Sequence, residues 1–351
     1  MTVSQREERI LGIIETARAK RPRFKDERIT MAHGAGGKAT QTLIEGLLAP
    51  AFGLDELADA AIVGDGIALT TDSFVVKPLR FPGGSIGELA VNGTVNDLAV
   101  AGARPLALSL ALILEEGLDS AVLRAEVEAM AGAAAAAGVQ IASGDTKVVE
   151  RGHADGMYVC TTGVGIRDPR AELSPGAVRP GDRVLVSGSI GEHGTAIMLA
   201  RGDLGLDADI VSDTRSLWPA VDAMLGPDVH CMRDATRGGV ASVLNEIARA
   251  AGVAIVVREG DVPVDPAVAG AAELLGIDPM YVANEGKFVA FVAAEAVEET
   301  LAALHAVDGY ERAAEIGEVR TEPTGMVLVE TAFGGRRVMD QLVGDPLPRI
   351  C

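Results

Sequence analysis

Residues 67–102 read IALTTDSFVVKPLRFPGGSIGELAVNGTVNDLAVAG, and they contain a predicted strand followed by a predicted helix. The strand covers residues 67–76, which are largely apolar and rich in β-branched side chains. The helix covers residues 85–102, because Ser85 is a favourable N-cap and Gly102 is a favourable residue for ending a helix. A strand that leads into a helix in this way predicts an α/β fold.

The same alternation of strands and helices continues on both sides of residues 168–182, DPRAELSPGAVRPGD. This stretch contains three prolines, which favour an irregular connection between two domains. We therefore predict an N-terminal domain at residues 29–167, a linker at 168–182 and a second α/β domain at 183–330. The further predicted strands are 105–114, 139–142, 157–166, 183–187, 229–232, 288–293 and 326–330, and the further predicted helices are 119–138, 192–201 and 236–251.

The two ends of the chain fall outside this pattern. Residues 1–28 are polar and lack the apolar run of a secretory signal, and no stretch of the chain has the length and apolarity of a membrane span, so we predict a cytoplasmic protein. These residues are expected to be a loosely attached N-terminal extension, or else a basic helix that docks a partner. Residues 331–351 contain glycines and prolines without a clear period, so they are predicted to be a mobile tail that ends in Cys351.

The composition excludes several classes of protein. Of the 351 residues 48% are hydrophobic, which is too many for an intrinsically disordered chain. The net charge of −19 argues against a nucleic-acid-binding protein, because such a protein needs a basic surface to neutralise phosphates. The three cysteines form no CxxC or Cys/His cluster, so neither a disulfide framework nor a zinc site is expected. The position of Cys351 at the very end of the chain is unusual.

Several acidic or amide side chains stand at the ends of predicted apolar segments. Each of them alone could be an ordinary cap or turn residue. Carboxylates that border a dry core are unfavourable unless they are paired or bound to a metal, and several of them together suit Mg²⁺ with a phosphate as co-ligand. The pattern therefore indicates an enzyme that handles nucleotide phosphates, although no Walker loop is present. The residues are Asp65, Asp72, Asn96, Asp97, Asp145 and Asp234.

Two further features could act on phosphates or protons. Residues 33–40, HGAGGKAT, place backbone N–H groups and a lysine side by side, which suits phosphate oxygens, although a flexible turn is the alternative. The charged residues Lys147 and Glu285 stand next to predicted strands. They are either solvated charges or groups that are brought to a phosphate or to a reacting proton.

Taken together, the chain resembles the HypE family of hydrogenase maturation factors, within the AIR-synthetase-like (PurM-like) ATP-binding superfamily. The resemblance covers about residues 29–351 and rests on the stretch quoted above and on HGAGGKAT, ASGDTKVVERG, MRDATRGGVASVLNEIA, NEGKF and the final PRIC. It implies a two-domain α/β (α+β) fold whose first domain forms a homodimer, and a flexible C-terminal tail.

The resemblance also implies a reaction. In that family a partner carbamoyltransferase, HypF, carbamoylates the terminal cysteine, and ATP is then used to dehydrate the product to a thiocyanate. The cyano group passes to iron on a HypC–HypD scaffold for a [NiFe]-hydrogenase. By similarity the substrate sulfur is that of Cys351, and ATP and Mg²⁺ are the expected cofactors.

Roles for the candidate residues follow from the same resemblance. The five aspartates Asp65, Asp72, Asp97, Asp145 and Asp234 are expected around Mg²⁺ and the ATP phosphates, and Lys147 and Glu285 near the modified sulfur. The alternatives are another ATP-dependent synthetase of the superfamily, such as a selenophosphate synthetase, or a non-catalytic maturation adaptor. The remaining residues expected near the nucleotide are Gly34, Gly36, Gly37, Lys38 and Asn96.

Overall fold

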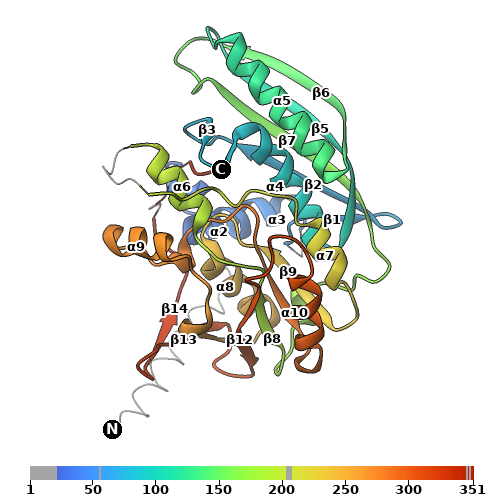
Figure 1. Cartoon of the computed structure of the whole chain (residues 1–351), viewed down its shortest axis with the longest axis vertical. Helices are drawn as coiled ribbons and strands as arrows, with labels where there is room; N and C mark the ends of the chain where they lie inside the picture. The colour runs from blue at the N-terminus through green and yellow to red at the C-terminus, as the bar shows by residue number, and fades with distance from the viewer. Residues whose placement is uncertain (1–21, 55–56, 203–207, 345–346, 348) are drawn as a thin grey trace.

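The computed structural model describes residues 22–54, 57–202, 208–344, 347 and 349–351, and it contains one large sheet in each of two stacked halves (Figure 1). Most of the predicted N-terminal extension, residues 1–21, lies outside the described residues. The first described elements are short helices that come before the first sheet: η1 (Met31–Gly34), α2 (Lys38–Leu43), η2 (Ile44–Leu48) and α3 (Ala49–Phe52).

The first domain is built on a five-stranded sheet with the order β1-β2-β7-β5-β6. Strands β5 and β6 run parallel, and the other neighbouring strands run antiparallel. Helices α4 and α5 cover one face, because their apolar side chains share a core with those of β2, β5 and β7. Most side chains of β6 are exposed. The elements are β1 (Ala61–Val63), β2 (Ile67–Phe74), α4 (Ile86–Val100), β5 (Ala103–Glu115), α5 (Ser120–Ala137), β6 (Gln140–Val149) and β7 (Met157–Arg167), with a small hairpin of β3 (Arg80–Phe81) and β4 (Gly84–Ser85).

The second domain is built on a seven-stranded sheet with the order β14-β13-β10-β12-β8-β11-β9. Its strands and helices are as follows: β8 (Arg183–Val186), α6 (Glu192–Ala200), α7 (Trp218–Met224), β9 (Val229–Asp234), α8 (Gly239–Ala251), β10 (Ala254–Arg258), α9 (Pro266–Leu275), β11 (Phe288–Val292), α10 (Val297–His305), β12 (Ala314–Arg320), β13 (Met326–Glu330) and β14 (Arg336–Met339). Short 3-10 helices lie at η3 (Pro175–Ala177), η4 (Glu259–Asp261), η5 (Pro279–Tyr281) and η6 (Ala294–Ala296).

Alternate residues of the central strands point to opposite faces of this second sheet. Val184 and Val186 of β8 pack in one core with side chains of α8, whereas Leu185 packs in another with side chains of α7 and α10. Strands that bury both faces are apolar throughout, which is why β8 and β11 consist largely of Val, Leu, Phe and Ala. Ala99 and Val100 at the end of α4 belong to the α7–α10 core, so the first domain is anchored to the second.

Helix α4 is buried nearly all round, because it lies between its own sheet, α5 and the second domain. This surrounding explains why the sequence of α4 shows no polar face. The prediction for its start is confirmed, with Ser85 at the N-cap. The helix predicted at 119–138 is also confirmed: the Asp119 side chain accepts a hydrogen bond from the Ala121 N–H, and Gly138 ends the helix in the left-handed conformation.

Two predictions about strands and loops are wrong. The strand predicted at 139–142 extends to Val149, because its backbone pairs with β5 along the whole ladder from Gln140 although its side chains are polar. The segment 331–351 was expected to lack regular structure, but residues Arg336–Met339 form β14, which pairs with β13. The exposed edge of β13 supplies the backbone hydrogen-bonding partners of β14. The local sequence of β14 does not reveal this pairing. Among the described residues, no helix has the length and apolarity that a bilayer crossing requires.

Candidate active site

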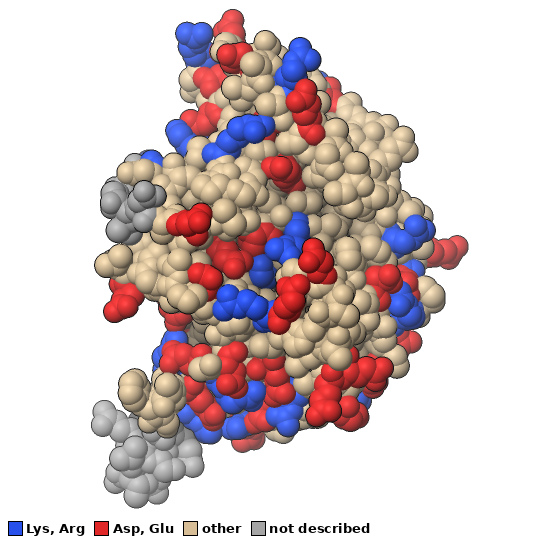
Figure 2. Space-filling view, viewed as in Figure 1, with Lys and Arg blue, Asp and Glu red and all other residues tan. Residues whose placement is uncertain are grey.

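Three carboxylates from distant parts of the chain meet where the two domains join. One oxygen atom from each of Asp59, Asp97 and Asp234 lies within 4.8 Å of the other two. Asp97 projects from α4 of the first domain, whereas Asp234 is the last residue of β9 in the second. The Thr70 hydroxyl donates a hydrogen bond of 2.7 Å to Asp97 Oδ2. Acidic and basic side chains also gather in a recess near the middle of the face shown in Figure 2.

The acidic cluster holds more negative charge than its neighbouring cations offset. Burial, followed by repulsion from Asp234, Asp59 and Asp72, raises the pKa of Asp97 well above its ordinary value. Burial and the Asp59 carboxylate likewise raise the pKa of Asp234. Arg233 pairs with Asp59, with 2.8 Å between Nε and Oδ2. A divalent cation with a preference for oxygen ligands would relieve the remaining repulsion, so these four aspartates fit Mg²⁺.

Glu285 lies beside this cluster with one carboxylate oxygen unpaired. Its Oε1 is buried and has no hydrogen-bond partner among the described residues. Burial, followed by the charges of Asp234, Asp72 and Asp213, raises the pKa of Glu285 well above its ordinary value. The backbone is held firmly: the Glu285 N–H donates to Asp213 Oδ1 at 3.0 Å, and Asn96 Nδ2 donates to the Glu285 carbonyl at 3.0 Å. The arrangement presents a proton acceptor on a fixed backbone.

The C-terminus of the chain is docked beside these residues, close to α4 and α6 (Figure 1). The Val75 N–H donates to the carbonyl of Cys351 at 3.0 Å, and the Lys77 N–H donates to the carbonyl of Arg349 at 3.3 Å. Ile350 is buried in a core that the first domain shares with α6 of the second. The last residues therefore lie alongside the chain that follows β2, as an added strand would. The structure thus shows the last residues in a docked position. The mobility that the sequence predicts for the tail stays a prediction.

Docking places the thiol of Cys351 among charged groups. Burial raises the pKa of this thiol to about 12, the guanidinium of Arg237 acts in the opposite direction, and the Glu285 carboxylate adds to the increase. In turn, negative charge at Cys351 is the largest cause of the raised pKa of Arg237. Cys351, Arg237 and Glu285 are therefore electrostatic neighbours, and the terminal sulfur lies next to the acidic cluster.

The glycine-rich segment packs against the same arginine. Arg237 Nη1 donates to the Gly34 carbonyl at 2.7 Å, and Ser242 Oγ donates to the Gly36 carbonyl at 2.9 Å. Gly36 has a φ of +75°, and a Cβ added there would lie 2.5 Å from the Arg237 carbonyl oxygen. The close approach requires glycine at this position.

The following two residues contact the chain after β14. A Cβ added at Gly37 would lie 2.6 Å from the Leu342 carbonyl oxygen, which accepts a 3.0 Å hydrogen bond from the Lys38 N–H. The Lys38 ammonium pairs with Asp340 at 2.7 Å on the surface. The glycine-rich segment thus joins the tail region to the Arg237 loop, and its predicted contact with phosphate stays a prediction.

Other predicted site residues lie elsewhere within this chain. Asp65 is exposed in the turn between β1 and β2. Asp145 and Lys147 are exposed on β6 and pair with each other, with 2.7 Å between Nζ and Oδ2. This pairing is the main cause of the lowered pKa of Asp145. The fold does not bring these three residues to the acidic cluster of the same chain. Their predicted roles therefore require a second molecule.

Asn96 was predicted near the nucleotide, and its amide makes three hydrogen bonds to the protein backbone. Its Nδ2 donates to the carbonyls of Arg215 at 2.9 Å and Glu285 at 3.0 Å, and its Oδ1 accepts from the Leu217 N–H at 2.8 Å. These bonds join α4 to the second domain directly below Glu285. The contacts favour a role in positioning Glu285, while a contact with nucleotide stays a prediction.

Sequence reasoning missed Asp59 and Arg237. Asp59 follows no apolar segment, and only the three-dimensional contact with Arg233 and Asp97 reveals it. Arg237 lies three residues after Asp234 in the quoted segment MRDATRGG, so a search for cations near the aspartates could have found it.

Comparisons with known proteins agree with this architecture. Two family models match the chain: the N-terminal domain of AIR synthase related proteins at residues 57–167 and their C-terminal domain at residues 179–330. The carbamoyl dehydratase HypE of Rhodobacter capsulatus is 50% identical over 338 residues, which cover 93% of this chain and 99% of that protein. HypE of Escherichia coli K12 is 45% identical, over 92% of this chain and 99% of that protein.

Solved structures of relatives show the same fold. The crystal structure of a HypE–HypF complex matches with a TM-score of 0.82 and 44% identity, over 86% of this chain and 99% of that chain. The structure of the hydrogenase maturation protein HypE in complex with ATP matches with a TM-score of 0.79 and 43% identity, over 92% of this chain and 100% of that chain. The expected AIR-synthetase-like fold is thereby confirmed, and the chain belongs to the HypE family of carbamoyl dehydratases.

Proposed function

We propose that this protein uses ATP to dehydrate a carbamoyl group on Cys351 to a thiocyanate, and that the cyano group becomes the cyanide ligand of a [NiFe]-hydrogenase iron centre. The observation that carries this proposal is the location of the Cys351 thiol beside Arg237, Glu285 and the acidic cluster. The relatives support the reaction class, because they are carbamoyl dehydratases and one solved relative contains ATP.

Mg²⁺ and the nucleotide phosphates fit the acidic cluster. Asp59, Asp72, Asp97 and Asp234 would hold the metal, because their carboxylates are buried or half-buried and repel one another. The guanidinium of Arg237 would contact phosphate oxygens on the neighbouring side, next to the glycine-rich segment that it binds at the Gly34 carbonyl. When bound, Mg²⁺–ATP would supply the phosphoryl group that turns the carboxamide oxygen into a leaving group.

The residues of the chain carry out the remaining steps. The overall reaction converts the S-carboxamide and ATP into the thiocyanate, ADP and phosphate, so the amide nitrogen loses both protons. Glu285 is placed to accept a proton, because its buried Oε1 has no hydrogen-bond partner among the described residues and because burial raises its pKa, which makes it a stronger base. Arg237 offsets negative charge that develops beside the sulfur.

A homodimer would give Lys147 and Asp145 a part in the reaction. Both project from β6, and the same face of the sheet exposes apolar side chains, including Leu69 on β2 and Ile113 on β5. Apolar side chains gathered on an open sheet favour contact with a second copy of this chain. Lys147 would then reach the site of the partner chain. HypF is the proposed carbamoyl donor, since a relative of this chain is solved in complex with HypF, and a HypC–HypD complex is the proposed acceptor.

Mass spectrometry of the C-terminal peptide tests the proposal. The purified chain is incubated with carbamoyl phosphate, the partner transferase and Mg²⁺–ATP. We expect a carbamoyl adduct on Cys351 that loses one water only when ATP is present, and no adduct in Cys351→Ser. Glu285→Gln should keep the adduct but lose water at least about 100-fold more slowly, because the proton acceptor is removed. An adduct on the wild-type chain that never loses water with ATP would refute the dehydration.

A further inference from the structure

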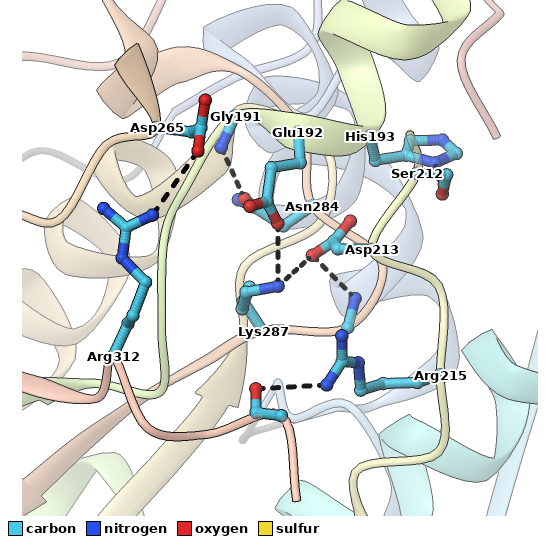
Figure 3. A network of polar contacts seen from close by, with 12 residues as sticks. Gly191, Glu192, His193, Ser212, Asp213, Arg215, Asp265, Asn284, Lys287 and Arg312 are labelled. Carbon is cyan, nitrogen blue, oxygen red and sulfur yellow. Dashed lines mark hydrogen bonds and ion pairs between the residues drawn. The ribbon is translucent and has the colours of Figure 1, made fainter. Parts of the chain in front are cut away.

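A buried ion-pair network lies behind the active site (Figure 3). The ammonium of Lys287 pairs with Glu192 Oε2 at 3.0 Å and with Asp213 Oδ2 at 3.1 Å. Burial alone would raise the pKa of Asp213, but the Lys287 charge holds that pKa below its ordinary value. A charged group this deeply buried and paired on two sides fixes the elements that carry it.

The network joins the segment that carries Glu285 to the start of helix α6. Asp213 Oδ2 accepts a hydrogen bond from the Gly286 N–H at 3.1 Å, next to the bond from Glu285 to Oδ1. The Gly191 N–H, at the N-cap of α6, donates to Asn284 Oδ1 at 2.8 Å. The helix start and the Glu285 segment are therefore held in one fixed relation.

His193 in the first turn of α6 reaches from this network to the tail. Its Nδ1 lies 2.8 Å from Ser212 Oγ, and its Nε2 lies 2.6 Å from the carbonyl oxygen of Ile350. A carbonyl can only accept, so Nε2 carries the proton and donates it. Ser212 Oγ accepts from the Thr214 N–H at 3.2 Å, and its own O–H is free to donate to Nδ1 when the histidine proton is on Nε2. Both ring nitrogens of His193 thus have partners in the neutral ring that carries its proton on Nε2.

The surroundings of the ring keep this tautomer. His193 is buried completely, and Phe81 packs edge-on against it with 5.5 Å between ring centroids. Burial lowers the pKa of His193, and the nearby Asp213 carboxylate only partly offsets this effect. The ring therefore presents one fixed N–H donor to the residue that precedes Cys351.

We propose that His193 is a positioning residue, which holds the Ile350 carbonyl so that the sulfur of Cys351 stays beside Glu285 and Arg237. The chain end has a single covalent connection, so one buried hydrogen bond at the adjacent peptide strongly restricts where the sulfur lies. Lys287 and Asp213 connect the segment that carries Glu285 to α6. The same network therefore positions both the proposed base, Glu285, and the C-terminal tail. The catalytic part of this inference rests on the proposed function, whereas the placement of the thiol does not.

Alkylation of Cys351 tests the placement without any catalysis. Iodoacetamide labelling is followed at the C-terminal peptide in the full chain, without ATP. We expect His193→Phe to be labelled about tenfold faster, because the undocked thiol regains water and a lower pKa. His193→Gln keeps a donor at the Nε2 position and should resemble the wild type, whereas His193→Asn is too short and should resemble His193→Phe. The matched control is His230→Phe, which removes another buried histidine, one bonded to Asp182.

Single-turnover dehydration on the carbamoylated chain tests the catalytic part. His193→Phe and His193→Asn should lower the rate at saturating ATP at least about tenfold, with the KM for ATP unchanged and with rescue by His193→Gln. Equal labelling and dehydration rates in the wild type, His193→Phe and His193→Asn would overturn the inference. A wild-type chain that never dehydrates would instead refute the proposed function, and the labelling result would still decide whether His193 places the thiol.

Discussion

At the scale of single residues, the site depends on charges that are left partly uncompensated. Asp97 and Asp234 lie within reach of a shared ion, and burial raises the pKa of each. Glu285 has a buried oxygen that finds no hydrogen-bond partner in the described part of the chain. Such groups lower the stability of the protein while no ligand is bound. They interact favourably once a cation or a reacting group binds beside them. This loss of stability without a ligand distinguishes the acidic cluster from the paired carboxylates of the surface.

Asp97→Asn should separate metal binding from folding. The change removes one of the repelling charges, so we expect the thermal midpoint without Mg²⁺ to stay the same or rise. We also expect Mg²⁺ and ATP together to raise the midpoint much less than in the wild type, because a metal ligand is lost. Thermal unfolding with and without Mg²⁺–ATP measures both effects. A variant that is stabilised by Mg²⁺–ATP as strongly as the wild type would exclude Asp97 from the metal site.

At the scale of elements, close backbone contacts bring the separate segments together. The glycine-rich segment reaches the Arg237 loop only because Gly36 has no side chain and a positive φ. The last residues add to the chain that follows β2 through bonds from Val75 and Lys77. Both contacts use backbone atoms, so side-chain patterns in the sequence predict them poorly.

Gly36→Ala should disrupt the first of these contacts. Its Cβ would lie 2.5 Å from the Arg237 carbonyl oxygen in a conformation that L-residues avoid, so we expect a loss of about 1–3 kcal/mol in the free energy of unfolding. Gly34→Ala is the control, since no atom of the described residues lies within 4 Å of a Cβ at that position. Denaturant unfolding of both variants gives the comparison. Equal stability of the two would show that the contact is not as tight as the geometry indicates.

Tail docking should weaken at high pH. Docking raises the pKa of the Cys351 thiol from 9.0 to about 12, so the docked state holds this proton more tightly than the free tail. The contribution is therefore complete below about pH 9 and is lost as the pH rises towards 12. Carboxypeptidase should release the last residues faster at pH 10 than at pH 8. Cys351→Ser corrects for the pH dependence of the protease, and an identical pH response in both chains would contradict the prediction.

At the scale of the whole molecule, the site forms only because two domains close around α4. Asp97 comes from the first domain, Asp234 from the second, and Ala99 anchors α4 in the core of the second. The first sheet presents an open side with exposed apolar residues, and Lys147 lies there, away from the acidic cluster. A second copy of the chain is the simplest way to complete both features.

Ile113→Glu should therefore weaken a homodimer. The Ile113 side chain is 38% exposed on β5 and lies beside Lys147 on the open face, where a buried carboxylate without a partner would be unfavourable in a dimer interface. We expect sedimentation to show a dimer for the wild type and a monomer for the variant, with an unchanged fold. Leu274→Glu is the control, because Leu274 is 73% exposed on the second domain. A monomeric wild type, or a variant that remains dimeric, would contradict the proposed interface.

The sequence alone determined the α/β class, the capped helices α4 and α5 and the family resemblance, and it singled out Cys351 as a candidate, because caps, periodicity and motifs are local properties. The tertiary structure alone decided which of the predicted aspartates meet, because Asp72, Asp97 and Asp234 converge with Asp59 while Asp65 and Asp145 stay apart. It also decided where the C-terminal residues lie in space: the hydrogen bond from His193 to the Ile350 carbonyl joins residues 157 positions apart. Contacts between backbone and distant side chains depend on how the domains pack, and no local pattern encodes them.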